Sequence, residues 1–177
     1  IEKMRVALDS FEVEGIGHNL PFLSAVMDHP KFVSGEMTTA FIAEEYPEGF
    51  EGVELPESEL RRIAAACAAM HRVGEIRRAR VSGRMDNHER KVGSDWNVKL
   101  QGENFDVVTK ADPEGATVAF SDGSEMRVSG DWTPGDQLAE MTVDGAPLVL
   151  KVGKISGGFR IRTRGADLKV HVRTPRQ

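Results

Sequence analysis

The chain has 177 residues, enough for one ordinary domain or for a small domain with part of another. Hydrophobic residues make up 40% and charged residues 29%, which allows a packed core and argues against a wholly disordered chain. No apolar run is long enough for a transmembrane helix, no signal peptide is recognisable, and the single cysteine, Cys67, excludes an internal disulfide.

The net charge of −5 is unevenly distributed along the chain. Residues 1–56 hold 3 basic and 11 acidic side chains, whereas residues 57–177 hold 20 basic and 17 acidic ones. Such a step in composition predicts a boundary between two units. Because the chain starts at Ile1 and stops at Gln177 without an end signal, we also expect it to be a segment of a longer protein.

The first 50 residues read as three short helices joined by turns. Apolar residues at helical spacing predict the first helix over residues 4–11. The second is expected to begin at the cap Asn19 and to end before Pro30, and the third to run from a cap at Thr38 or its neighbour through Glu45. Helices this short need a partner surface to be stable.

Residues 51–56 are rich in Pro, Gly and Glu and are predicted to form a linker. Residues 57–82 are predicted as one long helix, acidic at its start and basic at its end as the helix dipole favours, with Gly83 just beyond it. Its middle, residues 63–70, is apolar on every face. Such a helix is surrounded by other elements rather than laid on a surface, and its alanines let those elements come close.

A polar loop over residues 83–94 separates this helix from segments whose hydrophobic period is 2, the period of β-strands. The turn dipeptides Asp144-Gly145, Gly157-Gly158 and Gly165-Ala166 are among those expected to join these segments as β-hairpins. Consecutive hairpins predict an antiparallel meander between residues 95 and 174. Its eight expected strands are Trp96–Gln101, Asn104–Lys110, Ala116–Ser121, Glu125–Ser129, Gln137–Val143, Leu148–Ile155, Phe159–Thr163 and Leu168–Arg173.

Together these elements predict an α+β fold: an eight-stranded antiparallel β-barrel wrapped around a long central helix and preceded by short helices. The interior of an eight-stranded barrel normally holds little more than its own side chains, so small residues are what would let a helix pass through it. The alternative is a sandwich with the helix on one face of the sheet. We disfavour it because residues 63–70 carry no polar stripe.

No catalytic or cofactor-binding motif is recognisable. The glycines at 15, 17, 157 and 158 lack the strand, helix and lysine that accompany a phosphate loop. The five histidines lack the helical i, i+4 spacing that favours metal binding, and no serine lies in a Gly-x-Ser-x-Gly frame. We therefore expect no catalytic, cofactor-binding or metal-binding residue in this chain.

Three features of the long helix have competing interpretations. Cys67 is interpreted as a buried, inert thiol. His71 is interpreted as a hydrogen-bonded histidine of the core or its rim, with a catalytic base as the alternative. The basic cluster at its end is interpreted as a solvated face that complements the helix dipole, with docking to an acidic protein surface or to nucleic acid as alternatives. The cluster comprises Arg72, Arg77, Arg78, Arg80 and Arg84.

Several stretches resemble a known family. Gly15-Ile-Gly-His-Asn19, His29-Pro-Lys-Phe-Val-Ser-Gly35 and Thr38-Thr-Ala-Phe-Ile42 resemble the C-terminal tail of the biotin carboxylase domain. Tyr46-Pro-Glu-Gly-Phe-Glu-Gly52 is similar to the α subunits of propionyl-CoA carboxylase, which are biotin-dependent acyl-CoA carboxylases. The rest of the chain resembles the next domain of those subunits, the BT domain, which joins biotin carboxylase to carboxyltransferase.

The resemblance implies a division of the chain into a biotin carboxylase tail (1–50), a linker (51–56) and a BT domain (57–177). In this family a "hook" loop, here residues 83–94, touches the biotin carboxylase domain, while the helix and barrel surface face the carboxyltransferase β subunit. The interface residues that it implies in the hook are Arg84, Met85, Asp86, Asn87, His88, Glu89, Arg90, Lys91 and Val92.

The resemblance also implies an enzyme around this segment. The parent would use ATP, bicarbonate and Mg²⁺ or Mn²⁺ to carboxylate biotin, and would convert propionyl-CoA to methylmalonyl-CoA. None of the eight lysines here is flanked by Met on both sides, as the biotin-bearing lysine would be, so the segment itself is expected to be non-catalytic and to hold no cofactor.

The implied partners are the β subunit and the biotin carboxylase core of the same chain, in a large hetero-oligomer without nucleic acid or membrane. The implied location is the bacterial cytoplasm or the mitochondrial matrix. Two functions from other classes stay open: a small-ligand-binding β-barrel carrier and a nucleic-acid-binding barrel. A helix that fills the barrel would leave a carrier no cavity.

Overall fold

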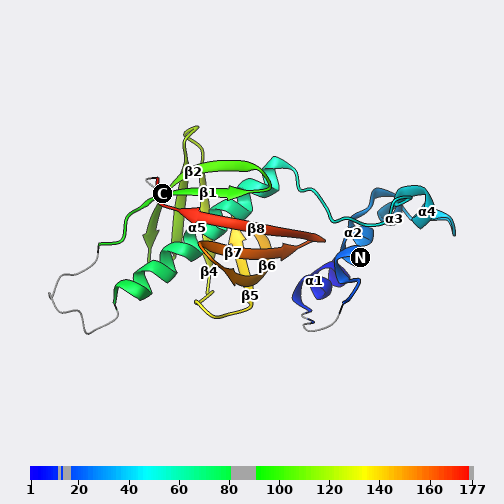
Figure 1. Ribbon diagram of the computed structural model, residues 1–177, viewed down its shortest axis with the longest axis horizontal. Coiled ribbons are helices and arrows are strands. Elements are labelled where there is room, and N and C mark those ends of the chain that lie inside the picture. Colours follow the sequence, from blue (N-terminus) through cyan, green and yellow to red (C-terminus); the bar gives the residue numbers. More distant parts are fainter. Residues whose placement is uncertain (12, 14–16, 81–90, 176–177) are drawn as a thin grey trace.

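The computed structural model describes residues 1–11, 13, 17–80 and 91–175. Within these ranges the chain forms a closed β-barrel that holds one long helix, and a group of short helices lies beyond one end of the barrel (Figure 1). The predicted fold class, an eight-stranded antiparallel barrel around a central helix, is thereby confirmed.

Four short helices, called the tail helices here, precede the barrel: α1 (Glu2–Ser10), α2 (Leu20–Asp28), α3 (Pro30–Ser34) and α4 (Phe41–Glu45). The prediction of three is wrong because Pro30, expected only to end the second helix, also starts α3, where a proline ring suits the first turn. Asn19 does occupy the N-cap position of α2, but its side chain makes no capping hydrogen bond.

An aromatic cluster holds the tail helices together. Phe22 of α2 meets Tyr46 and Phe50 edge to face, with ring centroids 5.2 and 5.5 Å apart. His29 meets Phe41 in the same way at 5.0 Å. This geometry is favourable for aromatic pairs, so the chain after α4 folds back onto α2.

The central helix α5 runs over Glu57–Ala79, with Arg80 at its C-cap. The prediction placed its end at residue 82, and residues 81–83 lie outside the described part of the chain. Every residue from Ile63 to Met70 is buried, as an apolar helix without a polar stripe requires.

The barrel is a single antiparallel meander in which each strand pairs with the next and β8 returns to pair with β1. Because the sheet closes on itself, the sandwich alternative is wrong. Each strand begins and ends within two residues of its predicted limits. The strands are β1 (Asp95–Leu100), β2 (Glu103–Asp112), β3 (Gly115–Phe120), β4 (Glu125–Gly130), β5 (Leu138–Val143), β6 (Ala146–Ile155), β7 (Gly158–Thr163) and β8 (Ala166–Arg173).

Two hairpin turns lie one residue earlier than predicted. The β7–β8 turn is Arg164-Gly165, with φ of +48° and +82°, and Ala166 already belongs to β8. Positive φ at both central positions is typical of a two-residue hairpin turn, in which a non-glycine first residue is tolerated. The β6–β7 turn is Ser156-Gly157, because Gly158 stands in β7, where a Cβ would lie 1.9 Å from the Val170 carbonyl oxygen.

The barrel wall encloses α5. The helix contacts β1, β2, β3, β4, β5 and β8, so it is surrounded rather than covered on one side. Ala64, Ala65, Ala66 and Ala68 are fully buried and face inward-pointing side chains such as Val98 of β1. Methyl groups on the helix are what leave room for those strand residues.

Replacing Ala65 by Leu should therefore destabilise the fold by about 1–3 kcal/mol, the usual cost of overpacking a closed core. Ala79 supplies a matched control, because it lies in the last turn of the same helix and is only partly buried. Urea unfolding of the two Ala→Leu variants is the measurement. Equal stability of both would contradict enclosure of the helix.

Candidate docking interface

Most of the predicted interface lies outside the described residues. Arg84, Met85, Asp86, Asn87, His88, Glu89 and Arg90 belong to the undescribed range 81–90, and the structure tests none of them. Lys91 and Val92 are described and form the root of the hook. We therefore build the interface from this root and from the barrel end at which it lies.

The root of the hook is fixed to the barrel. Val92 is partly buried and packs against the hydrophobic core. One residue further, the carbonyl oxygen of Gly93 accepts a hydrogen bond from the Arg72 guanidinium of α5, at 3.2 Å. Lys91 is exposed beside them. The chain thus leaves the hook at a defined point next to the helix.

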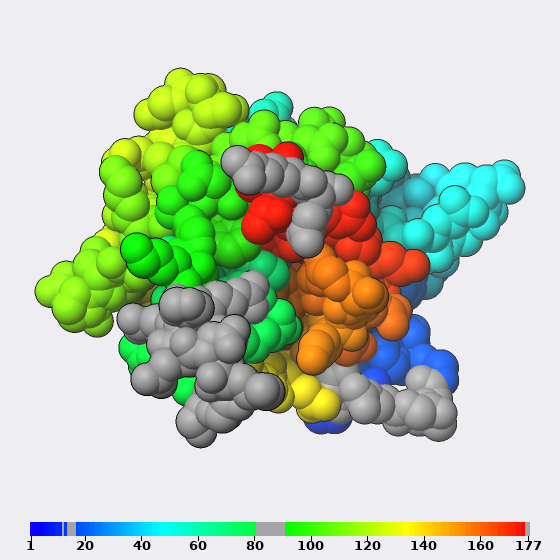
Figure 2. Space-filling model, turned by 60° about the vertical axis from the view of Figure 1, so that its left-hand side comes forward, coloured from blue at the N-terminus to red at the C-terminus, as the bar shows by residue number. Residues whose placement is uncertain are grey.

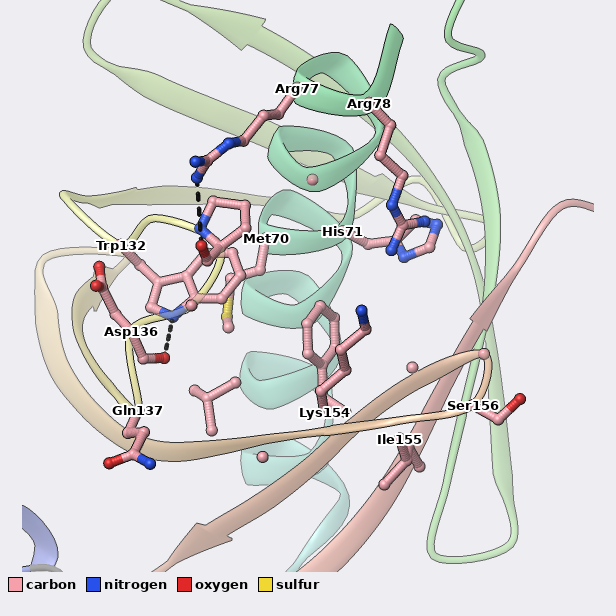
Figure 3. A pocket seen from close by; sticks show the side chains of 18 of the residues that line it. Met70, His71, Arg77, Arg78, Trp132, Asp136, Gln137, Lys154, Ile155 and Ser156 are labelled. Carbon is pink, nitrogen blue, oxygen red and sulfur yellow. Dashed lines mark hydrogen bonds between the residues drawn. The ribbon is translucent and has the colours of Figure 1, made fainter. Parts of the chain in front are cut away.

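At this end α5 emerges from the barrel beside a depression, called the mouth hollow here, of about 830 Å³ (Figure 3). Met70, His71 and Gly74 of α5 form one side of it, the segment from Trp132 to Gln137 a second, and the β6–β7 hairpin the third. In Figure 2 the end of α5 reaches the surface beside this orange hairpin. The hollow is thus bounded by three separate parts of the chain.

Aromatic side chains define the walls of the mouth hollow. The Trp132 and Phe159 rings lie edge to face with centroids 6.0 Å apart, and the Trp132 indole Nε1–H donates to the Asp136 carbonyl oxygen at 3.0 Å. Thr133 donates both its backbone N–H and its hydroxyl to the Asp136 carboxylate, at 2.9 and 2.8 Å. The loop between β4 and β5 is therefore held in one conformation by its own hydrogen bonds.

His71 stands between two aromatic rings. Its imidazole lies 4.8 Å from the Trp96 ring, edge to face, and 6.5 Å from the Phe159 ring. Burial lowers the pKa of His71 below its ordinary value, and the Arg78 charge acts in the same direction, while Glu75 opposes both. These contacts agree with a position at the rim of the core, and the hydrogen bond that the interpretation also expected stays a prediction.

The basic end of α5 is exposed at Arg77, Arg78 and Arg80, as a solvated face requires, and two arginines of the cluster also bond neighbouring loops. Besides the bond from Arg72 to the Gly93 carbonyl oxygen, Arg77 donates to the Pro134 carbonyl oxygen at 3.3 Å. Arg78 pairs with the buried carboxylate of Glu75. The arginines thus tie the helix to both loops that border it, and Arg84 lies outside the described residues.

At the opposite end, one buried and one exposed hydrogen bond join the tail helices to the barrel. The ammonium of Lys151, on β6 and only 9% exposed, donates to the Leu8 carbonyl oxygen of α1 at 2.8 Å. The Asp9 carboxylate accepts the backbone N–H of Arg164 at 3.0 Å. A cation at the C-terminal carbonyls of a helix complements its dipole, so Lys151 stabilises the last turn of α1 in this position.

Two further contacts make this junction tight. A Cβ at Gly165 would lie 2.6 Å from the Pro21 carbonyl oxygen, so the β7–β8 turn meets the first turn of α2 directly. The predicted linker is also anchored: the Leu55 N–H and carbonyl oxygen bond the Gln101 side chain at 3.2 and 3.1 Å.

The described residues contain no group of three or more His, Cys, Asp or Glu that could hold a metal ion. Cys67 is fully buried, and burial raises the pKa of its thiol far above the ordinary value, which fits the prediction of an inert side chain. None of the described helices has the length and apolar character needed to cross a membrane.

Comparison with known families now bears on this arrangement. Residues 63–177 match the family model of the propionyl-coenzyme A carboxylase BT domain. The chain belongs to this BT domain family. Residues 1–44 match the model of the biotin carboxylase C-terminal domain, so the tail helices and the barrel match two different families.

Whole-protein relatives give the same picture. The chain is 81% identical over its full length to the propionyl-CoA carboxylase alpha chain of Ruegeria pomeroyi, and 30% identical over 98% of its length to the mitochondrial alpha chain of Mus musculus. A stretch of 42 residues is 48% identical to the biotin carboxylase of Halalkalibacterium halodurans, of which it covers 9%. The chain spans about a quarter of the length of the two alpha chains.

The sequence did not identify either end of the barrel as a candidate contact surface. Lys151 reads as one polar position in an alternating strand, and Trp132 as part of a turn between strands. Their roles depend on Leu8 and Phe159, which are distant in sequence. The residue types of Lys151 and Trp132 were a signal that the sequence did offer. A lysine or tryptophan within or beside a closed sheet needs a hydrogen-bond partner for its polar atom.

Replacing Lys151 by Met should loosen α1 without unfolding the barrel, because Met keeps the apolar stem but donates no hydrogen bond to Leu8. We expect amide hydrogen exchange in α1 to accelerate by about 5- to 30-fold, which corresponds to about 1–2 kcal/mol. Lys154→Met, on the same strand but exposed, is the control and should leave α1 unchanged. Unchanged exchange in α1 of the Lys151 variant would show that this contact does not hold the tail.

Asp9 should make stability depend on pH. Burial raises its folded-state pKa above the ordinary value, although the Arg164 N–H and the charges of Arg164 and Lys151 oppose the shift. Stability should therefore fall as pH rises from about 4 through the raised pKa, because the carboxylate becomes charged in the folded state. Asp9→Asn keeps an acceptor for the Arg164 N–H but does not titrate. The free energy of unfolding in urea, measured as a function of pH, should no longer decline in this variant. An unchanged decline would show that another group causes the pH dependence.

Proposed function

We propose that this BT domain is the docking module of a biotin-dependent acyl-CoA carboxylase, propionyl-CoA carboxylase in particular. In this role it joins the biotin carboxylase part of an α chain to the carboxyltransferase β subunit. The match of residues 63–177 to the BT domain of propionyl-CoA carboxylase supports this proposal, as does the match of residues 1–44 to biotin carboxylase.

The observation that carries the proposal is the placement of the two junctions. The tail helices are bonded to one end of the barrel through Lys151 and Asp9. The root of the hook lies at the other end, with the last turns of α5 and the β6–β7 hairpin that border the mouth hollow, remote from the tail along the longest axis of the molecule (Figure 1). A filled barrel between these two ends would hold the tail helices and any partner bound at the mouth at a fixed separation.

The parent enzyme would be an ATP-dependent ligase that uses bicarbonate, biotin and Mg²⁺ or Mn²⁺ to carboxylate propionyl-CoA to methylmalonyl-CoA. The described residues contain no group of three or more His, Cys, Asp or Glu that could hold the metal ion. We propose that this segment contributes binding and that the chemical steps take place elsewhere in the parent enzyme. We expect it to lie in the bacterial cytoplasm or, in a eukaryote, in the mitochondrial matrix, since one relative is bacterial and another is named as mitochondrial.

The barrel interior argues against the ligand-carrier alternative. The side chains from Ile63 to Met70 fill the axis of the barrel, and all of them are buried. A lipocalin-like carrier needs that space for its ligand. The acidic net charge of −5 likewise gives no support to nucleic-acid binding.

The hook is the proposed contact that can be removed most cleanly. We expect replacement of residues 85–91 by a short Gly-Ser link, with Val92 kept in the core, to leave the thermal stability of the domain unchanged. Assembly of the carboxylase should weaken, because the hook's charges and Met85 would no longer reach a partner. Sizing of the reconstituted α and β subunits measures assembly.

A second loop exchange provides the matched control. Pro113 and Glu114 form the β2–β3 turn, and their replacement by Gly-Ser should leave assembly intact. Full assembly with the shortened hook would remove the docking role of the hook. Loss of folding would show that the hook is structural.

A further inference from the structure

The mouth hollow is large enough to hold an inserted side chain. Its floor is apolar and made by Met70, Val152 and Phe159, of which Met70 is only 2% exposed. Trp132 closes one side. A volume of about 830 Å³ is within the range of sites that hold a ligand or an inserted group, roughly 300–1,000 Å³.

The glycine in α5 keeps the hollow open. Gly74 lies in the wall of the hollow, in the helical part that stands outside the barrel. A Cβ there would meet only the Pro134 side chain among the described residues, at 4.0 Å, which is ordinary contact. Glycine weakens a helix, and no neighbouring atom lies close enough to exclude a side chain at this position. We therefore infer that Gly74 serves to leave the space beside it empty.

The charges around the hollow favour an acidic occupant. Its lining includes four cationic side chains, Arg77, Arg78, Lys154 and Arg162, against one carboxylate, Asp136. Arg78 is paired with the Glu75 carboxylate and Arg162 is half-buried, so the exposed excess of positive charge comes from Arg77 and Lys154. Asp136 already accepts the N–H and the hydroxyl of Thr133. Lys154 is exposed at the rim. Opposite charge across such a rim steers association and fixes the orientation of the partner.

The distribution of polar groups favours a protein segment over a small molecule. Small-molecule sites place a few polar groups deep in the cavity to orient the ligand. Here the floor is apolar and Arg77, Arg78 and Lys154 are exposed around it, whereas the Arg162 side chain is half-buried. An apolar centre with a polar rim is typical of a protein interface anchored by one buried side chain.

We propose that the mouth hollow receives one aromatic or aliphatic side chain of the carboxyltransferase subunit, presented by a segment that carries a carboxylate beside it. This inference rests on the proposed docking function and adds the place and the chemistry of the contact. It is independent of the hook, because every residue in the argument belongs to α5, the β4–β5 loop or the β6–β7 hairpin.

Gly74→Leu in the full-length α chain tests the proposal by filling the hollow. Leucine favours a helix more than glycine does, so the fold should be kept while the anchor is excluded. We expect affinity for the carboxyltransferase subunit to fall about 10- to 100-fold, the range of a lost anchor. Gly74→Ala is the matched control, because it also favours the helix but leaves the hollow largely open, and it should bind like the wild type.

A photocross-link identifies the occupant. With p-benzoylphenylalanine in place of Lys154, irradiation of the assembled enzyme should label a carboxyltransferase segment that contains an apolar residue and an acidic one. Labelling of the biotin carboxylase core, of a second α chain or of no protein would overturn the proposal. So would equal binding by the Gly74→Leu and Gly74→Ala variants.

Deletion of residues 57–175 separates this inference from the proposed function. If the deleted α chain retains biotin carboxylase activity and loses the carboxyltransferase subunit, the docking function stands, and the Gly74 variants alone decide the role of the hollow. If the deleted chain still binds that subunit, both the docking function and the anchor are wrong.

Discussion

The enclosure of α5 by a closed sheet is the constraint on which the rest of the molecule depends. Eight strands leave space for a helix only where its side chains are little more than methyl groups, as they are from Ala64 to Ala69. The same enclosure satisfies every strand edge, because β8 pairs with β1. It also fills the interior, so binding functions are confined to the ends and the outer surface of the barrel.

The helix is longer than the barrel is deep, and this difference creates the two ends. α5 has 23 residues, which span about 34 Å, whereas the strands have 6 to 10. Its first turn comes directly after the anchored linker at Leu55, and its last turns stand at the mouth, bonded through Arg72 and Arg77 to the loops on either side. One rigid element therefore runs from the junction with the tail helices to the root of the hook. A contact between the hook and the biotin carboxylase core of the same chain would require that core to extend along the whole barrel.

The sequence predicts those parts that depend on local patterning. Alternating polar and apolar residues predict strands such as Phe159–Thr163, and the apolar run of residues 63–70 predicts a buried helix. Together these two patterns predict a barrel around a helix. Features that depend on contacts between distant parts of the sequence could not be predicted. The Lys151 ammonium donates to a carbonyl oxygen 143 residues away, and the mouth hollow is lined by three separate segments. The α3 helix was missed because a proline ends one helix and starts another with equal ease. The hook residues 84–90 stay a prediction from resemblance.

Gly74 shows how stability and binding compete at the mouth. A glycine inside a helix costs about 0.5–1 kcal/mol relative to alanine, and it is usually retained where a neighbour lies too close for a side chain. Here the nearest described atom is an ordinary contact distance away, at 4.0 Å, so packing alone gives no reason for the glycine. Met70, one turn earlier in the same helix, is by contrast almost fully buried under the hollow. The helix is thus buried up to the floor of the hollow and carries no side chain at Gly74 above it, which is the arrangement expected if a partner supplies the missing side chain.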